Sequence, residues 1–375
     1  MLRTLATTAV LAGIVPVAAL GPLAPAPARP VPARSTLARS ASAFPMAARH
    51  HFGQPGNASG YAVIVATGRR RAWVFGGTNP GGQSAPVAEL WNGKLAVPSA
   101  LPARLSGFIS DASAPSADDI WAASEYGRYV LHWDGKRWHV AKRWRGGLIT
   151  GLTAIDARDV WVFGTTATGF GVMGTWHFNG QSWTAVRGLG HSIYRASAIS
   201  RRDIWAISAG RQTDSLLRFN GRSWRLLRTH ALKNMRPRDI LALSDRDVWV
   251  VGNLAGRSDS DRLLLAHWNG RTWTTIESQM EAWAGRLARG PRGGVLITAT
   301  PVAADAGLIL QASPSGRLSG TGIRFGAGSG VSDVVLVDGG RSLWATGGLL
   351  TRLGGDAAIW VSHVAAGAAR PDYDD

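Results

Sequence analysis

The chain has 375 residues, of which 45% are hydrophobic and 17% charged, enough for one large domain or two ordinary ones with a sizeable core. The formal net charge is +17, but 37 arginines and only 4 lysines carry it, which argues against a lysine-rich nucleic-acid-binding tail. The absence of cysteine excludes disulfides, thiolate metal sites and cysteine nucleophiles.

The N-terminus has the pattern of a secretory signal. Arg3 precedes an apolar stretch at 5–20, and small residues near 24–28 offer a cleavage site, so we expect a cleaved signal peptide at 1–28 and a secreted protein. The alternative, a membrane anchor, is disfavoured because the apolar run is short and contains Pro16. We expect no membrane span after signal cleavage. A Pro/Ala-rich lead-in at 29–55 follows.

A first motif, Asp, a β-branched residue and Trp, recurs along the rest of the chain. Its copies are "DDIWAAS" (118–124), "RDVWVFG" (158–164), "RDIWAIS" (202–208) and "RDVWVVG" (246–252), with weaker versions at 71–77, 294–300 and 342–348. The Trp or its equivalent falls at positions 73, 121, 161, 205, 249, 297 and 344. These positions define seven units of about 45 residues.

A second motif lies downstream of the first in most units. Its copies are "HWDGKRW" (132–138), "HFNGQSW" (177–183), "RFNGRSW" (218–224) and "HWNGRTW" (267–273), with a partial copy at 90–95. Asn-Gly or Asp-Gly between alternating apolar residues predicts a hairpin with a two-residue turn. Such a turn would place Trp268 and Trp273 diagonally on one face, packed against another sheet.

Each unit reads as four short strands, and the second strand is apolar at successive positions, as at 160–163. Burial on both faces is what a propeller blade requires, because each sheet packs between two others. We therefore predict an all-β fold, a seven-bladed β-propeller of four-stranded antiparallel blades over residues 56–363. The last unit lacks a fourth strand, so a segment within 42–54 should close the ring, and 364–375 should be a disordered acidic tail. A pair of sandwiches, the alternative, does not explain the seven-fold period.

The D-[IV]-W and W-[ND]-G-x-x-W repeats resemble those of secreted actinobacterial β-propeller proteins and, more distantly, kelch, tectonin and Asp-box repeats. The resemblance covers about residues 58–363 and implies the fold, while it is nearly silent on function. The sialidase Asp-box pattern S-x-D-x-G-x-x-W is not met, because here Asp or Asn directly precedes Gly.

The first strand of a blade lines the central channel of a propeller, and its start is found ten or eleven residues before each Trp marker. Polar and charged residues gather in that register: Asp111, Thr150, Tyr194, Arg195, Arg238, Asp239, Arg286 and Asp333. We expect them to ring one mouth of the channel and bind a polar or anionic ligand. The alternative is a water-filled funnel of mutually paired charges.

The turns between strands of one blade should gather on the opposite face and carry basic residues. These are Arg70, Arg158, Arg202 and Arg246 in the first turn of a blade, and Lys136, Arg222 and Arg271 in the second. Such a face fits an anionic envelope polymer, and a merely solubilising surface is the alternative. Nucleic acid is disfavoured, because no aromatic stacking partners are interleaved there.

No G-x-S-x-G, P-loop or H-E-x-x-H motif is present, and we expect no metal and no cofactor. His132, His177 and His267 share one register on different blades, too far apart to share an ion. We expect a secreted, monomeric, non-catalytic binding or scaffold protein whose ligand is a glycan, an envelope polymer or a protein. The alternative is an extracellular hydrolase or lyase with Asp111, Asp239 and Asp333 as acid/base residues.

Overall fold

The computed structural model describes residues 47–52, 58–165, 173–187, 189, 192–209, 214–255, 262–304, 306–351 and 354–363. The contacts divide the chain into two units, Met1–Ser40 and Ala41–Asp375, and all described residues belong to the second. The predicted signal peptide at 1–28, most of the lead-in and the predicted tail at 364–375 lie outside the described residues.

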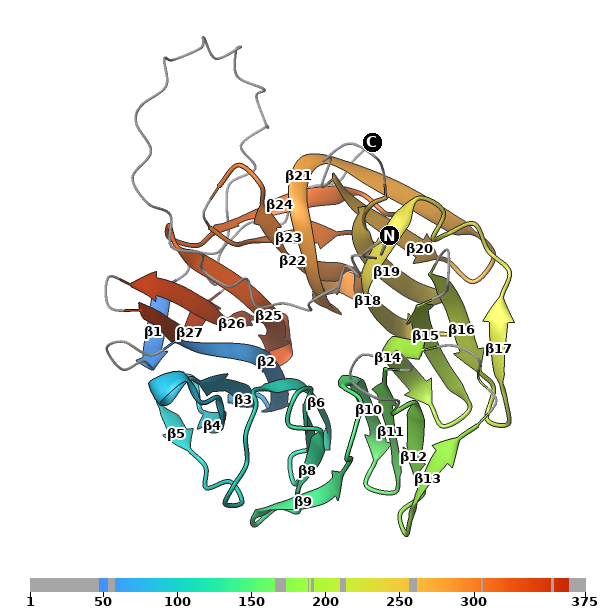
Figure 1. Ribbon diagram of the computed structural model, residues 1–375. Coiled ribbons are helices and arrows are strands. Elements are labelled where there is room, and N and C mark those ends of the chain that lie inside the picture. Colours follow the sequence, from blue (N-terminus) through green and yellow to red (C-terminus); the bar gives the residue numbers. More distant parts are fainter. Residues whose placement is uncertain are drawn as a thin grey trace, which may run out of the picture. The chain divides into compact units, whose positions relative to one another are not determined.

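The second unit is a seven-bladed β-propeller of four-stranded antiparallel sheets (Figure 1). Blade 1 contains β2 (Ser59–Gly68), β3 (Arg71–Thr78), β4 (Ala85–Trp91) and β5 (Ala96–Pro98). Blade 2 contains β6 (Ile109–Ser116), β7 (Asp119–Ser124), β8 (Tyr129–Trp133) and β9 (Trp138–Arg143). Blade 3 contains β10 (Ile149–Asp156), β11 (Asp159–Gly164), β12 (Thr175–Phe178) and β13 (Trp183–Val186). Blade 4 contains β14 (Ser192–Ser200), β15 (Asp203–Ala209), β16 (Ser215–Phe219) and β17 (Trp224–Leu227).

Blades 5 and 6 share one strand. Blade 5 contains β18 (Met235–Ser244), β19 (Asp247–Leu254), β20 (Arg262–Trp268) and the first part of β21 (Trp273–Arg289). Blade 6 contains the second part of β21, then β22 (Val295–Pro301), β23 (Leu308–Ala312) and β24 (Leu318–Arg324). The 17 residues of β21 pair first with β20 and then with β22, so the outer strand of one blade continues into the inner strand of the next.

Blade 7 combines both ends of the described chain. It contains β25 (Ser329–Val337), β26 (Ser342–Thr351), β27 (Gly354–His363) and the N-terminal β1 (Ala47–Phe52). The antiparallel pairing of β1 with β27 places β1 in the fourth position of the sheet, inside the segment 42–54 that the sequence predicts for it. Each inner strand contacts the inner strand of the next blade, and β25 contacts β2 (Figure 1).

Helical structure is minor in the described part of the chain. It consists of three short 3-10 turns, η1 (Pro80–Gly82), η3 (Pro291–Gly293) and η4 (Asp338–Gly340). Among the described residues, no helix has the length and apolar character needed to cross a membrane.

The second strands of the blades are buried on both faces, as the sequence predicts, and their tryptophans fill the spaces between blades. Trp73 of blade 1 packs edge-on against Trp138 of blade 2, with ring centroids 5.1 Å apart. The same contact joins blades 3 and 4, where Trp161 meets Trp224 at 5.6 Å. The indoles therefore supply the apolar contacts by which neighbouring blades adhere.

The Asp of the first motif holds the Trp and a residue of the neighbouring strand together. In blade 3, Oδ1 of Asp159 accepts hydrogen bonds from Trp161 Nε1 and from His177 Nε2, both at 2.9 Å. The imidazole of His177 stacks on the indole at 4.3 Å. Blades 2 and 5 repeat the arrangement with His132 and His267. In blade 4 Arg218 takes the place of the histidine, paired with Asp203 and lying 4.6 Å above Trp205.

The Asn-Gly turn is longer than the sequence predicts. Trp268 and Trp273 are direct cross-strand partners rather than diagonal ones, and four residues connect them. The side chain of Asn269 accepts the backbone N–H groups of Arg271 and Thr272, each at 2.9 Å. Within this turn, from Asn269 to Thr272, Gly270 is the residue with positive φ, at 90°. The prediction of a two-residue turn was therefore wrong. The side chain of Asn269 caps the turn, and its backbone does not adopt the left-handed conformation that a two-residue turn requires.

Candidate functional site

All seven inner strands carry a backbone irregularity at an equivalent place. The register shifts lie at Tyr61/Val63, Ile109/Asp111, Ile149/Gly151, Ile193/Arg195, Pro237/Asp239, Ala284/Leu287 and Val331/Asp333. A bulge inserts one extra residue and redirects the side chain that follows it. Four predicted site residues directly follow a bulge (Asp111, Arg195, Asp239 and Asp333), and Arg286 lies within the irregularity of β21.

Side chains from five of these positions form a charged layer in the channel: four of them are joined by ion pairs, and the fifth, Asp333, acts on Arg286 by its charge. Arg195 Nη1 lies 3.3 Å from Asp111 Oδ2, and Arg195 Nε lies 3.9 Å from Asp239 Oδ1. Arg286 Nη1 approaches the other oxygen of Asp111 at 3.3 Å and Nη2 donates to the carbonyl of Ser110 at 3.0 Å. The structure therefore brings together residues that are far apart in the sequence, and their charges are directed at one another.

The carboxylates of the layer also join neighbouring blades. One oxygen of each accepts a backbone N–H from the inner strand of the next blade. The pairs are Asp111 with Leu152 at 2.9 Å, Asp239 with Leu287 at 2.7 Å, and Asp333 with Ile64 at 3.1 Å. A buried carboxylate is stabilised by several hydrogen-bond donors. These three groups therefore connect neighbouring blades whether or not a ligand binds.

The other three predicted residues are the extra residues of the bulges themselves. Thr150 donates from Oγ1 to the carbonyl of Ile193 at 2.9 Å, and the hydroxyl of Tyr194 donates to the carbonyl of Pro237 at 3.1 Å. Arg238 is half-buried at the equivalent place on β18. Thr150 and Tyr194 thus bridge successive blades, outside the charged layer.

Burial shifts the pKa values of the layer. Desolvation raises the pKa of Asp239 and raises that of Asp333 to about 6, although Arg286 acts in the opposite direction on both. Burial lowers the pKa of Arg195, with the neighbouring Arg286 adding to the effect. For Arg286 itself desolvation is outweighed by the nearby carboxylates, and its pKa is raised. The layer therefore couples acids and bases whose charge depends on one another.

Glu125 is a member of this electrostatic group that the sequence reasoning missed. Its pKa is raised by burial, while Arg195 lowers it, so the carboxyl lies within the field of the channel. It follows β7 in the loop to β8 and so lies outside the inner-strand register used to select candidates. In the sequence its only distinguishing feature is that glutamate is rare, with Glu89, Glu277 and Glu281 as the others.

A cavity of about 400 Å³ extends along the inner strands of blades 2 to 6. Asp111, Arg195, Asp239 and Arg286 lie at one end, and the lining then follows small residues such as Ser113, Ala154 and Ser197 toward the turns at the ends of these strands. The sequence predicts a ring of charges at the channel mouth where the inner strands begin. In the structure these side chains are largely buried, and the cavity lies on their turn side.

The predicted basic face is made of turns that touch within each blade. The backbone of Gly180 lies against the side chain of Arg158, and Gly270 lies likewise against Arg246. All seven predicted basic residues are exposed: Arg70, Arg158, Arg202, Arg246, Lys136, Arg222 and Arg271. Within the described part of the chain, no carboxylate comes within 4 Å of any of their charged groups.

The same turns carry some acidic side chains, which reduce the positive charge without cancelling it. Asp156 pairs with Arg201, and Asp338 lies 3.4 Å from Arg69. Asp118, Asp134 and Asp245 are the other acidic residues of these turns. The basic residues named above are additional to those pairs, so an excess of unpaired cations remains on this face, which we call the turn face.

The histidines lie in separate blades, each held by its own Asp and Trp. Across the described ranges, no group of three or more His, Asp or Glu side chains is arranged to hold a metal ion.

No protein-family model matches the chain, and no curated protein matches it in sequence. Solved propellers match in structure. The chain is similar to YCF48 bound to the D1 peptide, with a TM-score of 0.57, 13% identity and coverage of 86% of this chain and 97% of that one. It is similar to virginiamycin B lyase from Staphylococcus aureus (TM-score 0.58, 11% identity, coverage 85% and 99%) and to the WD40 repeats of RRP9 (0.59, 12%, 85% and 97%). These similarities extend over the whole propeller and concern the fold.

Proposed function

We propose that the protein is secreted and acts as a non-catalytic binding propeller that holds an anionic polymer on its turn face. The observation that carries this proposal is the contrast between two sets of charges. Those in the channel pair with one another, whereas those on the turn face are exposed and have no carboxylate within 4 Å among the described residues. Unpaired surface cations attract a polyanion and can neutralise it without first breaking internal ion pairs.

The signal-like pattern at 1–28 supports the extracellular setting of this proposal, in which anionic envelope polymers are the available partners. The exposed aromatic side chains Tyr126, between β7 and β8, and Trp283, within β21, do not belong to the turns of the turn face, so base stacking has no support there and nucleic acid stays disfavoured. The cavity of about 400 Å³ adds a place where a polar group of the ligand would meet Arg195 and Arg286 from the turn side.

The proposal is tested by retention of the purified protein on immobilised heparin, used as a model polyanion. We expect retention at moderate salt and elution as salt rises, because screening weakens exposed charge pairs. Replacing Arg158, Arg202 and Arg246 together by Gln should weaken binding at least tenfold. The matched control replaces Arg145, Arg228 and Arg236, which are also exposed but lie beyond the turn face, by Gln. Equal loss in both triple variants, or flow-through of the unchanged protein at low salt, would contradict the proposal.

An extracellular hydrolase or lyase is the second candidate, and the raised pKa values of Asp239 and Asp333 favour it. A carboxyl with such a pKa can donate a proton near neutral pH. Each of these carboxylates also accepts a backbone N–H of the next blade, which is the reason we place binding first.

A further inference from the structure

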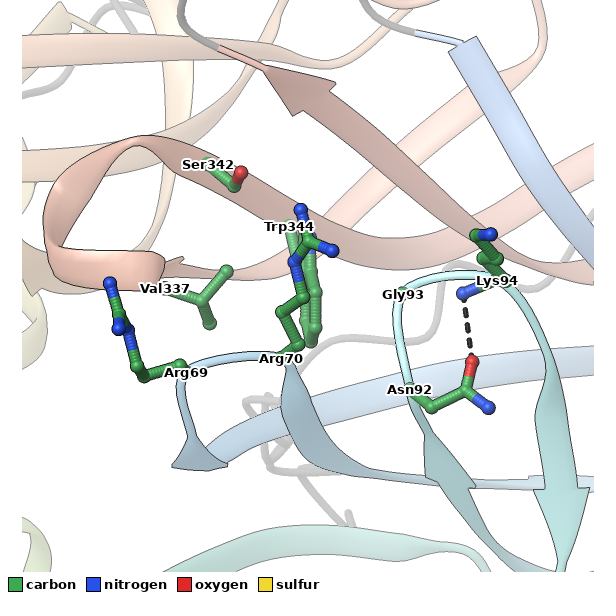
Figure 2. A pocket seen from close by; sticks show the side chains of 8 residues that line it. All are labelled: Arg69, Arg70, Asn92, Gly93, Lys94, Val337, Ser342 and Trp344. Carbon is green, nitrogen blue, oxygen red and sulfur yellow. Dashed lines mark hydrogen bonds between the residues drawn. The ribbon is translucent and has the colours of Figure 1, made fainter.

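A second cavity, of about 490 Å³, lies between blade 7 and blade 1 on the turn face. Arg69 and Arg70 reach it from the turn between β2 and β3, and Lys94 from the turn between β4 and β5 (Figure 2). Ser342 and Trp344 of β26 line the opposite side (Figure 2). Two turns of one blade therefore face the second strand of its neighbour across a hollow.

The hollow coincides with a departure from the repeat. In blades 2, 3 and 5 an Asp stands two residues before the Trp, and a His on the paired strand stacks on the indole. In blade 7 Ser342 stands two residues before Trp344, and the cross-strand partner of Trp344 is Val361. The carboxylate and the imidazole that cover the indole elsewhere are thus replaced by smaller, uncharged side chains.

The departure leaves the indole N–H of Trp344 without its usual acceptor. Trp344 is only 2% exposed, and among the described residues its Nε1 has no hydrogen-bond partner. The Nε1 atoms of Trp73 and Trp205 are unpaired among the described residues as well, so this state alone does not mark a ligand site. Trp344 also lines the cavity, but its Nε1 is itself buried, so a ligand in the cavity would contact the ring rather than this N–H.

The cations beside the cavity define the kind of acceptor. Arg69 lies 3.4 Å from Asp338, but Arg70 and Lys94 are exposed and pair with no carboxylate within the described ranges. A guanidinium and an ammonium match the oxygens of a phosphate or carboxylate. The volume exceeds that of a bare ion and is in the range of small-molecule sites.

We propose that this pocket binds an organic phosphate or carboxylate of small-molecule size, with Arg70 and Lys94 balancing its charge and the ring of Trp344 packing against it. The inference deepens the proposed function, on which it rests for one source of the anion, a repeating unit of the bound polymer. The other source is a free organic anion. The test below separates the two.

Isothermal titration calorimetry with glucose 6-phosphate, glucuronate and glucose tests the pocket in the full chain. We expect both anions to bind and neutral glucose not to bind. Replacing Arg70 and Lys94 together by Gln should weaken binding of the anions at least tenfold. Ser342→Asp should do the same, because it restores the carboxylate that other blades place beside the indole and repels the ligand. A control with Arg228→Gln and Arg236→Gln removes the same charge elsewhere and should stay within about twofold.

Absence of binding by either anion, or unchanged affinity in Ser342→Asp, would overturn the inference. Because blades 2 to 5 contain Asp at this position, circular dichroism and the melting temperature of Ser342→Asp should show a folded protein. Reduced heparin retention in Ser342→Asp identifies the polymer as the source of the anion, and unchanged retention identifies a free organic anion. If glucose 6-phosphate binds while no polyanion does, the pocket stands and the proposed polymer function fails.

Discussion

Oδ1 of Asp159 accepts two hydrogen bonds at once, from an indole and from an imidazole. A carboxylate can accept from several donors, and the imidazole donates because the carboxylate has no proton to give. Asp119 and Asp247 repeat this pattern. The motif Asp, β-branched residue, Trp is therefore a structural unit, and the histidines of the repeat are explained without a metal.

Asp333 gives a pH dependence with a definite sign. Burial raises its pKa from 3.8 to about 6, so the folded state binds this proton more tightly than the unfolded chain. The associated stability is fully present below about pH 4 and is lost as the pH rises through about 6. We expect the free energy of unfolding of the unchanged protein, minus that of Asp333→Asn, to fall by up to about 3 kcal/mol over this window. Urea denaturation at a series of pH values measures it, and a constant difference would show that Asp333 is not the titrating group.

The residues of the channel layer could be selected from the sequence because their register is counted from a conspicuous Trp. Their pairing could not be predicted, because the bulges before Asp111 and Arg195 change the alternation of side chains along β6 and β14 and turn these two residues toward one another. Arg195 and Asp111 are 84 residues apart, and nothing local indicates which Arg meets which Asp. The pocket beside Trp344 was also missed, although Ser342 in place of the repeat's Asp was a visible signal.

The hairpins between third and fourth strands depend on one glycine each. Gly270 has a φ of 90°, and an added Cβ would lie 2.7 Å from Cβ of Arg246. The glycine thus serves two needs, the left-handed backbone and the close approach of the first turn of the same blade. This close approach brings Arg246 beside the second turn and builds the turn face.

Gly270→Ala should therefore destabilise the protein more than a comparable substitution without the steric contact. Gly82→Ala is the matched control, because Gly82 has a similar φ of 83° and open space around it. The control should cost about 1 to 2 kcal/mol from backbone strain alone. Gly270→Ala should cost about 1 to 3 kcal/mol more, from overpacking against Arg246. Chemical denaturation measures both, and equal losses would mean that the turns do not press on each other.

Strand positions were the most predictable feature at this scale. The expected second strand of blade 3 corresponds to β11, because its run of apolar residues is buried on both faces. Turn type was less predictable, since Asn269 caps the turn with its side chain and the sequence pattern fits either geometry. The fusion of two strands into β21 was not expected, because blade 6 lacks the Trp markers that delimit the other units.

At the scale of the molecule, β1 and β27 join the two ends of the propeller in one sheet. The pairing aligns His50 with Ile359 and His51 with Ala358. Without β1, one edge of β27 would present unpaired backbone groups, which invite pairing with another chain. The seven-fold period made the propeller predictable from the sequence, and the missing fourth strand of the last unit indicated where β1 belongs.

The double substitution of His50 and His51 by Pro tests this role of β1. Neighbouring N–H groups of a strand point to opposite sides, so one of the two must face β27, and Pro removes both. We expect the melting temperature to fall by about 5 to 10 °C, with increased light scattering from self-association. The double substitution by Thr keeps both N–H groups and should melt like the unchanged protein. Equal melting of the Pro and Thr variants would show that this pairing contributes little.

The shared strand β21 has a consequence for the order in which the blades of the propeller unfold. Blades 5 and 6 are joined by a continuous strand rather than by a loop, because Glu281 pairs with β20 and the next residue, Ala282, pairs with β22. Elsewhere in the ring a connecting segment can absorb the motion of one blade. These two blades should therefore act as a single mechanical piece, the last to loosen when the protein is pulled or heated.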